Sequence, residues 1–238
     1  MSHQAIGLVL SPVLLAQALG VRRRALVLPE ASGPRQGTSG SGPRLRLLIV
    51  GDSSAAGVGV ATQDQALAGQ IVAALALRRR VDWRLVARTG ATTRGTLARL
   101  TAGLEGGVVD HAVTALGVND LTGGTLLPRW RDQQLRLWDT LTTTYGARRI
   151  VVSGVPPMGG FPVLPQPLRW VLGQRAAIFD DALRRMTEGL PHVTHLQMDF
   201  TAADRGLMAA DGFHPGPAIY AQWGRAIAAA ILPEEPPP

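Results

Sequence analysis

Cysteine and lysine are both absent from this chain of 238 residues, and aromatic residues make up only 5% of it. Without cysteine, the chain forms no disulfide, offers no thiolate nucleophile and builds no cysteine-ligated metal site. The formal charge of +7 comes entirely from arginine, because all 24 basic residues are arginines. A nucleic-acid-binding surface needs a basic stripe interleaved with aromatic side chains, so the scarcity of aromatics disfavours nucleic acid as a partner.

The apolar stretch at residues 5–21 is shorter than the roughly 20 residues that span a bilayer comfortably. Positive residues follow it, at Arg22, Arg23 and Arg24, instead of preceding it as in a signal peptide. Two interpretations stay open. The stretch either inserts in a membrane, with the arginines on the cytoplasmic side, or lies on the domain surface or the membrane interface. We therefore expect a cytoplasmic protein, with association to the inner membrane through residues 5–21 as the alternative.

Composition divides the chain into four parts. Residues 1–28 contain the apolar segment, and residues 29–44 are rich in proline, glycine and serine, which predicts a flexible linker. Residues 45–232 form the expected domain, and residues 233–238 a disordered tail. The hydrophobic content of 46% is ample for one core.

Within the domain, apolar runs alternate with amphipathic stretches. Strands are predicted over 45–50, 81–87, 108–116 and 149–155, with a weaker fifth at 193–197, and helices over 63–79, 93–104, 128–145, 168–189 and 217–231. This alternation predicts an α/β fold in which helices cover both faces of a parallel sheet. The first run is apolar on both faces and therefore predicts a central strand.

Ser53 follows this first strand directly, after Gly51 and Asp52. Ligands bind at the carboxyl ends of the strands in such sheets, so Ser53 is a candidate nucleophile. The small residues after it permit a helix or tight turn with backbone N–H groups directed toward the serine. A serine is a weak nucleophile until a base removes its proton and donors stabilise the oxyanion.

His214 is the best candidate for that base. Asp211 stands three residues before it, in a loop with Gly212 and Pro215, and its carboxylate could hold the imidazole in the correct tautomer. The remaining histidines favour structural roles, because they lie in the terminal apolar segment or beside predicted strands: His3, His111, His192 and His195.

Gly90 and Asn119 follow the second and third predicted strands. The backbone N–H of Gly90 and the side-chain amide of Asn119 could bind the same oxyanion. Their alternative roles are a plain turn glycine and a helix cap. Asp52 is expected to hold the turn through hydrogen bonds, since Asp211 already supplies a carboxylate for the base.

Four stretches together resemble the SGNH (GDSL-like) hydrolase family. They are Gly51-Asp52-Ser53-Ser54, the stretch RTGATT with Gly90, Gly117-Val118-Asn119-Asp120, and Asp211-Gly212-Phe213-His214-Pro215. All four blocks occur in the family's order over about residues 45–232, and the one departure is serine at position 54, where the family signature has leucine. The GxSxG elbow of α/β-hydrolases is absent, which favours this fold over that one.

The resemblance implies a flavodoxin-like three-layer α/β/α sandwich with five parallel strands. It implies a serine esterase in which Ser53 is the nucleophile, Asp211 and His214 are acid and base, and Ser53, Gly90 and Asn119 form the oxyanion hole. The reaction would pass through an acyl-enzyme and would need neither a metal nor an organic cofactor.

The proline-rich and glycine-rich loop at 156–167 is too long for a plain connection and is expected to shape a pocket. Its apolar residues Met158, Phe161 and Leu164 would line an acyl site, which favours lipid, lysophospholipid or short acyl esters as substrates. The alternatives are an O-acetyl-carbohydrate esterase and an acyltransferase of the same fold. A catalytically silent binding module is disfavoured by the complete set of site residues, and the oligomeric state is left open.

Overall fold

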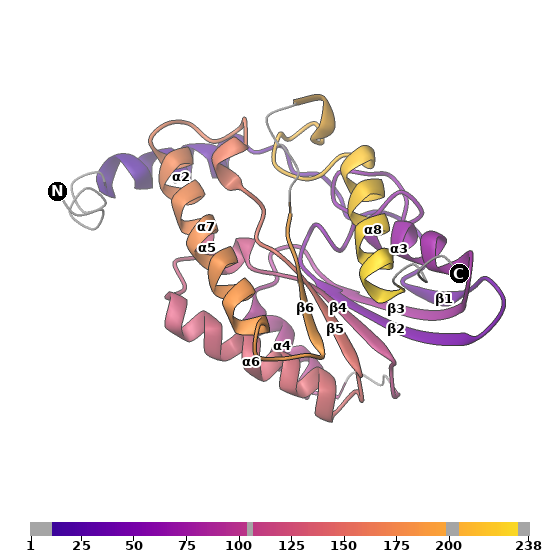
Figure 1. The fold of residues 1–238 in the computed structure, drawn as a ribbon. Coiled ribbons are helices and arrows are strands. Elements are labelled where there is room, and N and C mark those ends of the chain that lie inside the picture. Colours follow the sequence, from indigo (N-terminus) through magenta and orange to yellow (C-terminus); the bar gives the residue numbers. More distant parts are fainter. Residues whose placement is uncertain (1–10, 104–106, 199–204, 233–238) are drawn as a thin grey trace, which may run out of the picture.

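The computed structural model describes residues 11–103, 107–198 and 205–232. Six strands form one sheet in the order β1-β3-β2-β4-β5-β6, with helices on both faces (Figure 1). Five of them run parallel: β2 (Arg44–Gly51), β3 (Arg80–Ala87), β4 (His111–Ala115), β5 (Arg149–Ser153) and β6 (Val193–Leu196). Their order is that of flavodoxin-like sheets, so the predicted fold class is confirmed, the weak fifth strand included.

The sixth strand, β1 (Gln36–Ser39), corrects two expectations, the five-stranded sheet and the flexible linker at 29–44. It pairs antiparallel with β3 along the edge of the sheet. Its sequence, QGTS, has no apolar alternation, because neither face of this edge strand is buried in the core. The Thr38 hydroxyl donates to the Asp82 carboxylate at 2.8 Å, so polar contacts supplement the backbone pairing.

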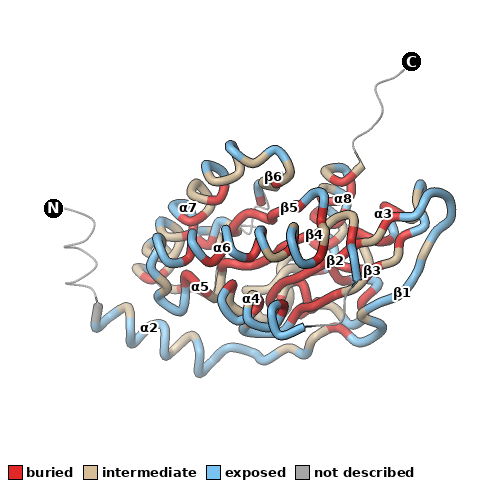
Figure 2. Tube along the Cα trace, turned by 90° about the horizontal axis from the view of Figure 1, so that it is seen from below, coloured by how far each residue is buried: buried red, intermediate tan, exposed pale blue. Residues whose placement is uncertain are grey.

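β2 lies at the centre of the sheet and is buried on both faces. Leu48 and Val50 face one apolar cluster, while Leu47 and Ile49 face the other, and none of the four is more than 2% exposed. The first cluster is covered by α4 (Thr93–Thr101), α6 (Leu127–Thr143) and α7 (Leu168–Thr187), and the second by α3 (Leu67–Ala76) and α8 (Pro217–Ile231). Figure 2 shows the buried strands enclosed between these two layers.

The chain leaves β2 toward β3 on one side and later returns to β4 on its other side. In parallel sheets a crevice opens where the strand order reverses in this way, outside the carboxyl ends of the strands. The short helices α5 (Val118–Thr122), η1 (Met158–Gly160) and η2 (Arg205–Leu207) lie in connections that follow β4, β5 and β6. The sequence stretches that carry the candidate site residues therefore converge on the edge of the sheet where the parallel strands end.

The N-terminal segment is described from residue 11 onward, so residues 1–10, with His3 and the start of the apolar stretch, lie outside the described residues, as does the expected tail at 233–238. Its helix, α2 (Ser11–Arg24), contacts the start of α7 (Figure 1). The Gln17 amide donates to the Gln166 carbonyl at 2.7 Å, and Gln17 Oε1 accepts from the Leu168 N–H at 3.1 Å. Among the described helices, none has the length and apolar character needed to cross a bilayer.

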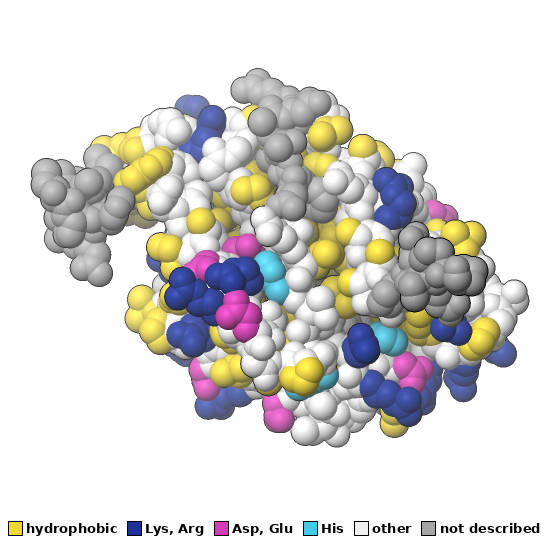
Figure 3. All heavy atoms as spheres, viewed as in Figure 1, with side chains coloured by type: hydrophobic (Ala, Val, Ile, Leu, Met, Phe, Trp, Pro, Cys, Tyr) yellow, Lys and Arg dark blue, Asp and Glu magenta, His cyan; other side chains and the backbone are white. Residues whose placement is uncertain are grey.

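Charged side chains of both signs lie side by side over α7 (Figure 3). Arg184 pairs with Asp181 and Glu188, and Arg185 pairs with Asp181. These pairs are exposed and contribute little to stability. They do, however, neutralise part of the arginine excess on this face.

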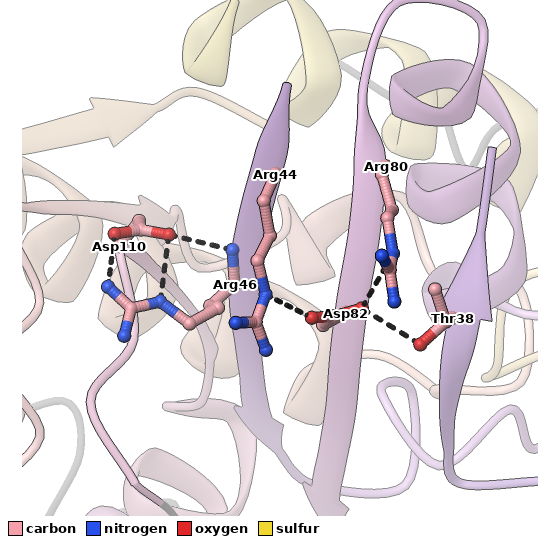
Figure 4. Close-up of polar contacts among 6 residues, drawn as sticks. All are labelled: Thr38, Arg44, Arg46, Arg80, Asp82 and Asp110. Atoms are coloured by element: carbon pink, nitrogen blue, oxygen red, sulfur yellow. Dashed lines mark hydrogen bonds and ion pairs between the residues drawn. The ribbon is translucent and has the colours of Figure 1, made fainter. Parts of the chain in front are cut away.

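Ion pairs fix the opposite edge of the sheet, where the strands begin (Figure 4). Asp110 accepts hydrogen bonds from the Arg46 backbone N–H at 2.8 Å and from its guanidinium at 2.8 and 3.1 Å. These bonds lower the pKa of Asp110 to about 2. Because Asp110 directly precedes β4 and Arg46 lies in β2, the pair helps to set the register of these two strands.

We expect Asp110→Asn to lower the free energy of unfolding at pH 7 by about 1 to 2 kcal/mol, because an amide cannot accept the charge-assisted bonds from Arg46. The folded-state pKa of about 2 lies below the ordinary 3.8. The stabilisation is therefore complete above about pH 4 and is lost as the pH falls toward 2. Urea denaturation between pH 7 and pH 2.5 should show the parent and variant converging at low pH.

Asp132→Asn is the matched control. Asp132 pairs with Arg136 at 3.0 Å on the exposed face of α6, and such a pair contributes less than about 1 kcal/mol. Equal losses in the two variants would contradict the role assigned to Asp110.

Candidate active site

Gly51 ends β2 at a point where no larger residue fits. A Cβ atom there would lie 2.4 Å from the Ala55 Cβ and 2.8 Å from the Ala115 carbonyl oxygen. The chain then turns tightly, with the Ala56 N–H donating to the Asp52 carbonyl at 2.9 Å and the Val58 N–H to the Ser53 carbonyl at 3.0 Å. Of the two possibilities left open by the small residues, a turn follows Ser53, and it holds the serine at the carboxyl edge of the sheet.

Ser53, His214 and Asp211 form a continuous hydrogen-bonded chain. His214 Nε2 lies 2.9 Å from Ser53 Oγ, and His214 Nδ1 lies 2.5 Å from Asp211 Oδ2. Ser53 follows β2, whereas Asp211 and His214 belong to the loop between η2 and α8. The fold therefore brings together three side chains that the sequence separates by up to 161 positions.

The Asp211 carboxylate also holds the backbone of its own loop. Its Oδ1 accepts from the Phe213 N–H at 2.9 Å and the His214 N–H at 3.0 Å. Burial raises the pKa of Asp211, but the hydrogen bonds from the His214 ring and from these two amides outweigh burial and keep the pKa below its ordinary value. An ionised Asp211 makes Nδ1 the protonated nitrogen, so Nε2 is free to accept the Ser53 hydroxyl proton.

Asn119 lies in α5 and lines the same cavity as Ser53. Its side-chain amide donates to the Ala91 carbonyl at 3.0 Å and makes a longer contact of 3.4 Å with Asp52 Oδ2. The alternative role of a helix cap does not apply, because the residue at the cap of α5 is Gly117.

Gly90 lies in the loop between β3 and α4, beside Ala91, whose carbonyl holds the Asn119 amide. Its φ of +76° is strained for any residue with a side chain. A Cβ atom there would meet nothing within 4 Å, so Gly90 borders open space. The residue is adjacent to the Ser53 site, and it lines a second cavity instead of the one that Ser53 lines.

Asp120, next to Asn119 in α5, joins this helix to the start of α4, which follows the loop that carries Gly90. Its buried carboxylate accepts from the Thr93 N–H at 3.0 Å and the Thr93 hydroxyl at 2.9 Å, and the Trp130 indole N–H donates to the same hydroxyl at 3.1 Å. Sequence reasoning noticed Asp120 only as part of a motif. Its partner Thr93 is 27 positions away, and no local pattern relates the two.

Asp52 is 4% exposed and is held directly behind the serine. Its Oδ1 accepts from the Ser54 N–H at 3.0 Å, as expected for a residue that fixes the turn. Burial raises the pKa of Asp52 to about 6. Through the contact with Asn119, it also connects the turn that carries Ser53 to α5.

A narrow apolar cavity of about 60 Å³ opens beside Ser53. Of the three residues predicted to line an acyl site, Phe161 does so, and its ring meets that of Phe213 edge to face at 5.3 Å. For Met158 and Leu164 the prediction was wrong. They are 0% and 3% exposed and pack into the core beneath the loop instead.

Other apolar residues of the cavity were missed. They come from β4, α8 and the segments that flank residues 199–204: Ala115, Leu116, Met198, Met208, Phe213, Ile219 and Trp223. The four-residue spacing of Ile219 and Trp223 marks one face of α8, but that pattern equally predicts a face buried in the core.

The structural interpretation of His195 agrees with its contacts, since His195 lies in β6 and its Nε2 is 2.9 Å from Oδ1 of Asp180, a residue of α7. Asp180 also accepts from the Val155 N–H at 2.9 Å and thereby fixes the chain after β5. Within the described ranges, no cluster of three or more His, Asp or Glu residues is arranged to hold a metal ion.

Known proteins share this sequence pattern. Residues 49–222 match the model of the GDSL-like Lipase/Acylhydrolase family. A GDSL-like esterase of Mycobacterium tuberculosis (strain ATCC 25618 / H37Rv) is 32% identical over 189 residues, which cover 74% of this chain. The match covers 58% of that esterase, so the chain spans less than two thirds of its length.

Solved structures share the fold. The psychrotrophic esterase EstA from Pseudoalteromonas sp. superposes with a TM-score of 0.60 at 19% identity, over 78% of this chain and 96% of that one. A carbohydrate esterase family 2 enzyme from Corynascus thermopiles superposes with a TM-score of 0.61 at 16% identity, over 86% of this chain and 68% of that one. At identities this low, the superpositions establish a common fold alone.

We expect Asp52→Asn to remove part of the pH dependence of stability. Burial raises the folded-state pKa of Asp52 from 3.8 to about 6. Between about pH 4 and pH 6, the folded protein therefore holds a proton that the unfolded chain has released. The free energy of unfolding should fall as the pH rises through this range in the parent, and fall less in the variant.

Urea denaturation at intervals between pH 4 and pH 7.5 measures this difference. Parallel pH profiles for parent and variant would show that the ionisation does not belong to Asp52.

Proposed function

Because the chain belongs to the GDSL-like lipase/acylhydrolase family, we propose that it is a serine esterase that cleaves carboxylic esters through an acyl-enzyme. The observation that carries the proposal is the hydrogen-bonded chain from Asp211 through His214 to Ser53, at the mouth of an apolar cavity. A nucleophile, a base and a group that orients the base are the three parts that such catalysis needs.

In the first step, Ser53 Oγ attacks the ester carbonyl while His214 Nε2 takes the hydroxyl proton. Asp211 stabilises the resulting imidazolium from the Nδ1 side. The oxyanion receives hydrogen bonds from the Ser53 N–H, the Gly90 N–H and the Asn119 amide. One hydrogen of that amide is engaged by the Ala91 carbonyl, and the second, whose contact with Asp52 is long at 3.4 Å, is available to the substrate.

In the second step, His214 donates its proton to the departing alkoxide, and the C–O bond breaks to leave acyl-Ser53. A water molecule then attacks the acyl group, and His214 again accepts the proton. Collapse of the second tetrahedral intermediate releases the carboxylic acid and returns the proton to Ser53. This chain's own residues supply every proton transfer in the sequence.

The size of the cavity favours short acyl chains over long lipid chains. A volume of about 60 Å³ has room for only a few water-sized groups. Its lining is mostly aliphatic and aromatic, so it suits a hydrocarbon chain of about two to four carbons. We propose short-chain acyl esters as the substrate class.

Removal of O-acetyl groups from carbohydrate is the second candidate. The small cavity accepts an acetyl group, and the similarly folded enzyme from Corynascus thermopiles is described as a carbohydrate esterase. Activity confined to acetyl esters would favour this candidate over a general short-chain esterase.

We expect Ser53→Ala and His214→Ala each to reduce kcat for p-nitrophenyl butyrate by at least about 10³-fold, because each removes one part of the nucleophile–base pair. The far-UV circular dichroism spectrum should not change. His192→Gln is the matched control, since His192 lies beside β6, away from Ser53, and its activity should stay within about 2-fold of the parent. Near-parent activity in either alanine variant would refute the mechanism.

We expect Phe161→Ala to shift the acyl-chain optimum toward longer chains, because the ring closes part of the cavity wall. The measurement is kcat/KM for p-nitrophenyl esters from acetate to palmitate, with the parent optimum at about two to four carbons. Leu164→Ala is the matched control from the same loop, because Leu164 is buried in the core. It should lower stability and leave the optimum in place, and a parent optimum at long chains would contradict the proposal.

A further inference from the structure

A second, larger cavity of about 520 Å³ lies at the carboxyl end of β3, between this strand and α4. Its lining includes Gly51, Gly90 and Ala91, so it borders the nucleophile turn and the loop that holds the Asn119 amide. In the sheet, β3 and β4 flank β2 on opposite sides. The two cavities therefore lie on opposite sides of the strand that carries Ser53.

The side chains of this cavity differ sharply from those of the apolar one. Arg88 and Arg99 line it together with the hydroxyl-bearing Thr92 and Thr96, and no carboxylate is among the lining residues. Among the residues that the structure describes, neither guanidinium has an ion-pair partner. The carboxylate that contacts this loop, Glu30, is engaged by the Thr89 N–H at 2.7 Å and by Arg35.

Arginines elsewhere in the fold show what a neutralised pair looks like. Arg44 and Arg80 share Asp82 at the amino end of the strands (Figure 4), and Arg184 and Arg185 of α7 both pair with Asp181. Arg88 and Arg99 instead are exposed side chains that line one cavity. An anion in the cavity would be attracted to both charges.

We propose that this cavity binds an anionic group, a phosphate or a carboxylate, carried on the alcohol portion of the ester substrate. The inference rests on the proposed esterase function and adds a substrate class to it. With the acyl chain in the apolar cavity on the β4 side, the alcohol portion of an ester held at Ser53 extends toward β3. Guanidinium groups bind planar or tetrahedral oxyanions in bidentate fashion, which gives both affinity and orientation.

Among the lining glycines, Gly90 leaves room for such a group. A Cβ atom at Gly90 would contact nothing within 4 Å, so the loop beside the reacting carbonyl does not obstruct the passage. The volume of the cavity is sufficient for a glycerol 3-phosphate or glycerate portion, whereas the apolar cavity of about 60 Å³ is not.

Butyryl esters of glycerol, glycerate and glycerol 3-phosphate test the inference, because they differ chiefly in the charge of the alcohol portion. At low ionic strength, the parent should hydrolyse the two anionic esters with a kcat/KM about 10-fold above that of the neutral ester, and added salt should reduce this ratio. In the double variant Arg88→Gln, Arg99→Gln, the ratio of anionic to neutral rates should fall about 10- to 100-fold. The two anionic arms distinguish a phosphate site from a carboxylate site.

Arg94→Gln is the matched control, because Arg94 is exposed on the same helix and does not line the cavity. Its ratio should stay within about 2-fold of the parent. A parent without preference for anionic esters, or a control that loses the preference as fully as the double variant, overturns the inference and leaves the esterase function intact.

A binding measurement reads the cavity without catalysis. Calorimetry on the Ser53→Ala protein should show that glycerol 3-phosphate or glycerate binds. The two glutamine substitutions should raise the dissociation constant at least about 10-fold. Inorganic phosphate as competitor separates recognition of the anion alone from recognition of the whole alcohol. Equal binding with and without the two arginines overturns the inference, whether or not the parent hydrolyses esters. Absence of ester hydrolysis by the parent would overturn the proposed function, and the binding result does not depend on it.

Discussion

Burial of β2 on both faces is the constraint on which the rest of the structure depends. Its side chains alternate between two apolar clusters, and a shift of one residue would exchange Leu48 and Val50 with Leu47 and Ile49. Each of these side chains contributes about 1.5 to 3 kcal/mol by leaving water, and each cluster is shaped to its own set. The strand is therefore held in one register, and the position of Ser53, two residues beyond its end, follows from packing that takes no part in chemistry.

Two buried carboxylates convert this rigid strand end into a site of defined geometry. Asp52 joins the turn after β2 to Asn119, and Asp120 joins the loop after β4 to Thr93 at the start of α4. Burial raises the pKa of both groups, so each is held in place at some cost in stability. The cost is consistent with the proposed esterase function, because hydrogen-bond donors that are oriented in advance need not reorganise as negative charge develops on a substrate.

The sequence was most informative where chemistry and strand ends coincide. Ser53, Asn119, Asp211 and His214 could all be predicted to meet, because each follows a strand or lies in a loop at the edge where parallel strands end. β1 could not be predicted, since an edge strand needs no apolar alternation and QGTS resembles a linker. Met158 and Leu164 were assigned to the cavity, and Ile219 and Trp223 were not, because apolar side chains look alike in sequence whether they face the core or a pocket. Arg88 and Arg99 acquire meaning only from the packing of α4 against β3.

Under the proposed function, the strand order would also give the two halves of an ester bound at Ser53 different surroundings. Residues from β4, β5 and α8 enclose the apolar cavity on one side of Ser53, while β3 and α4 enclose the cationic cavity on the other. Among the described residues, no helix lines both cavities, and the two walls meet only near the turn that carries Ser53. A change in α8 can therefore alter the acyl group that is accepted without moving the arginines, and a change in α4 can alter the alcohol without moving the apolar wall. A central nucleophile between independent walls allows selectivity for acid and for alcohol to vary separately within one fold.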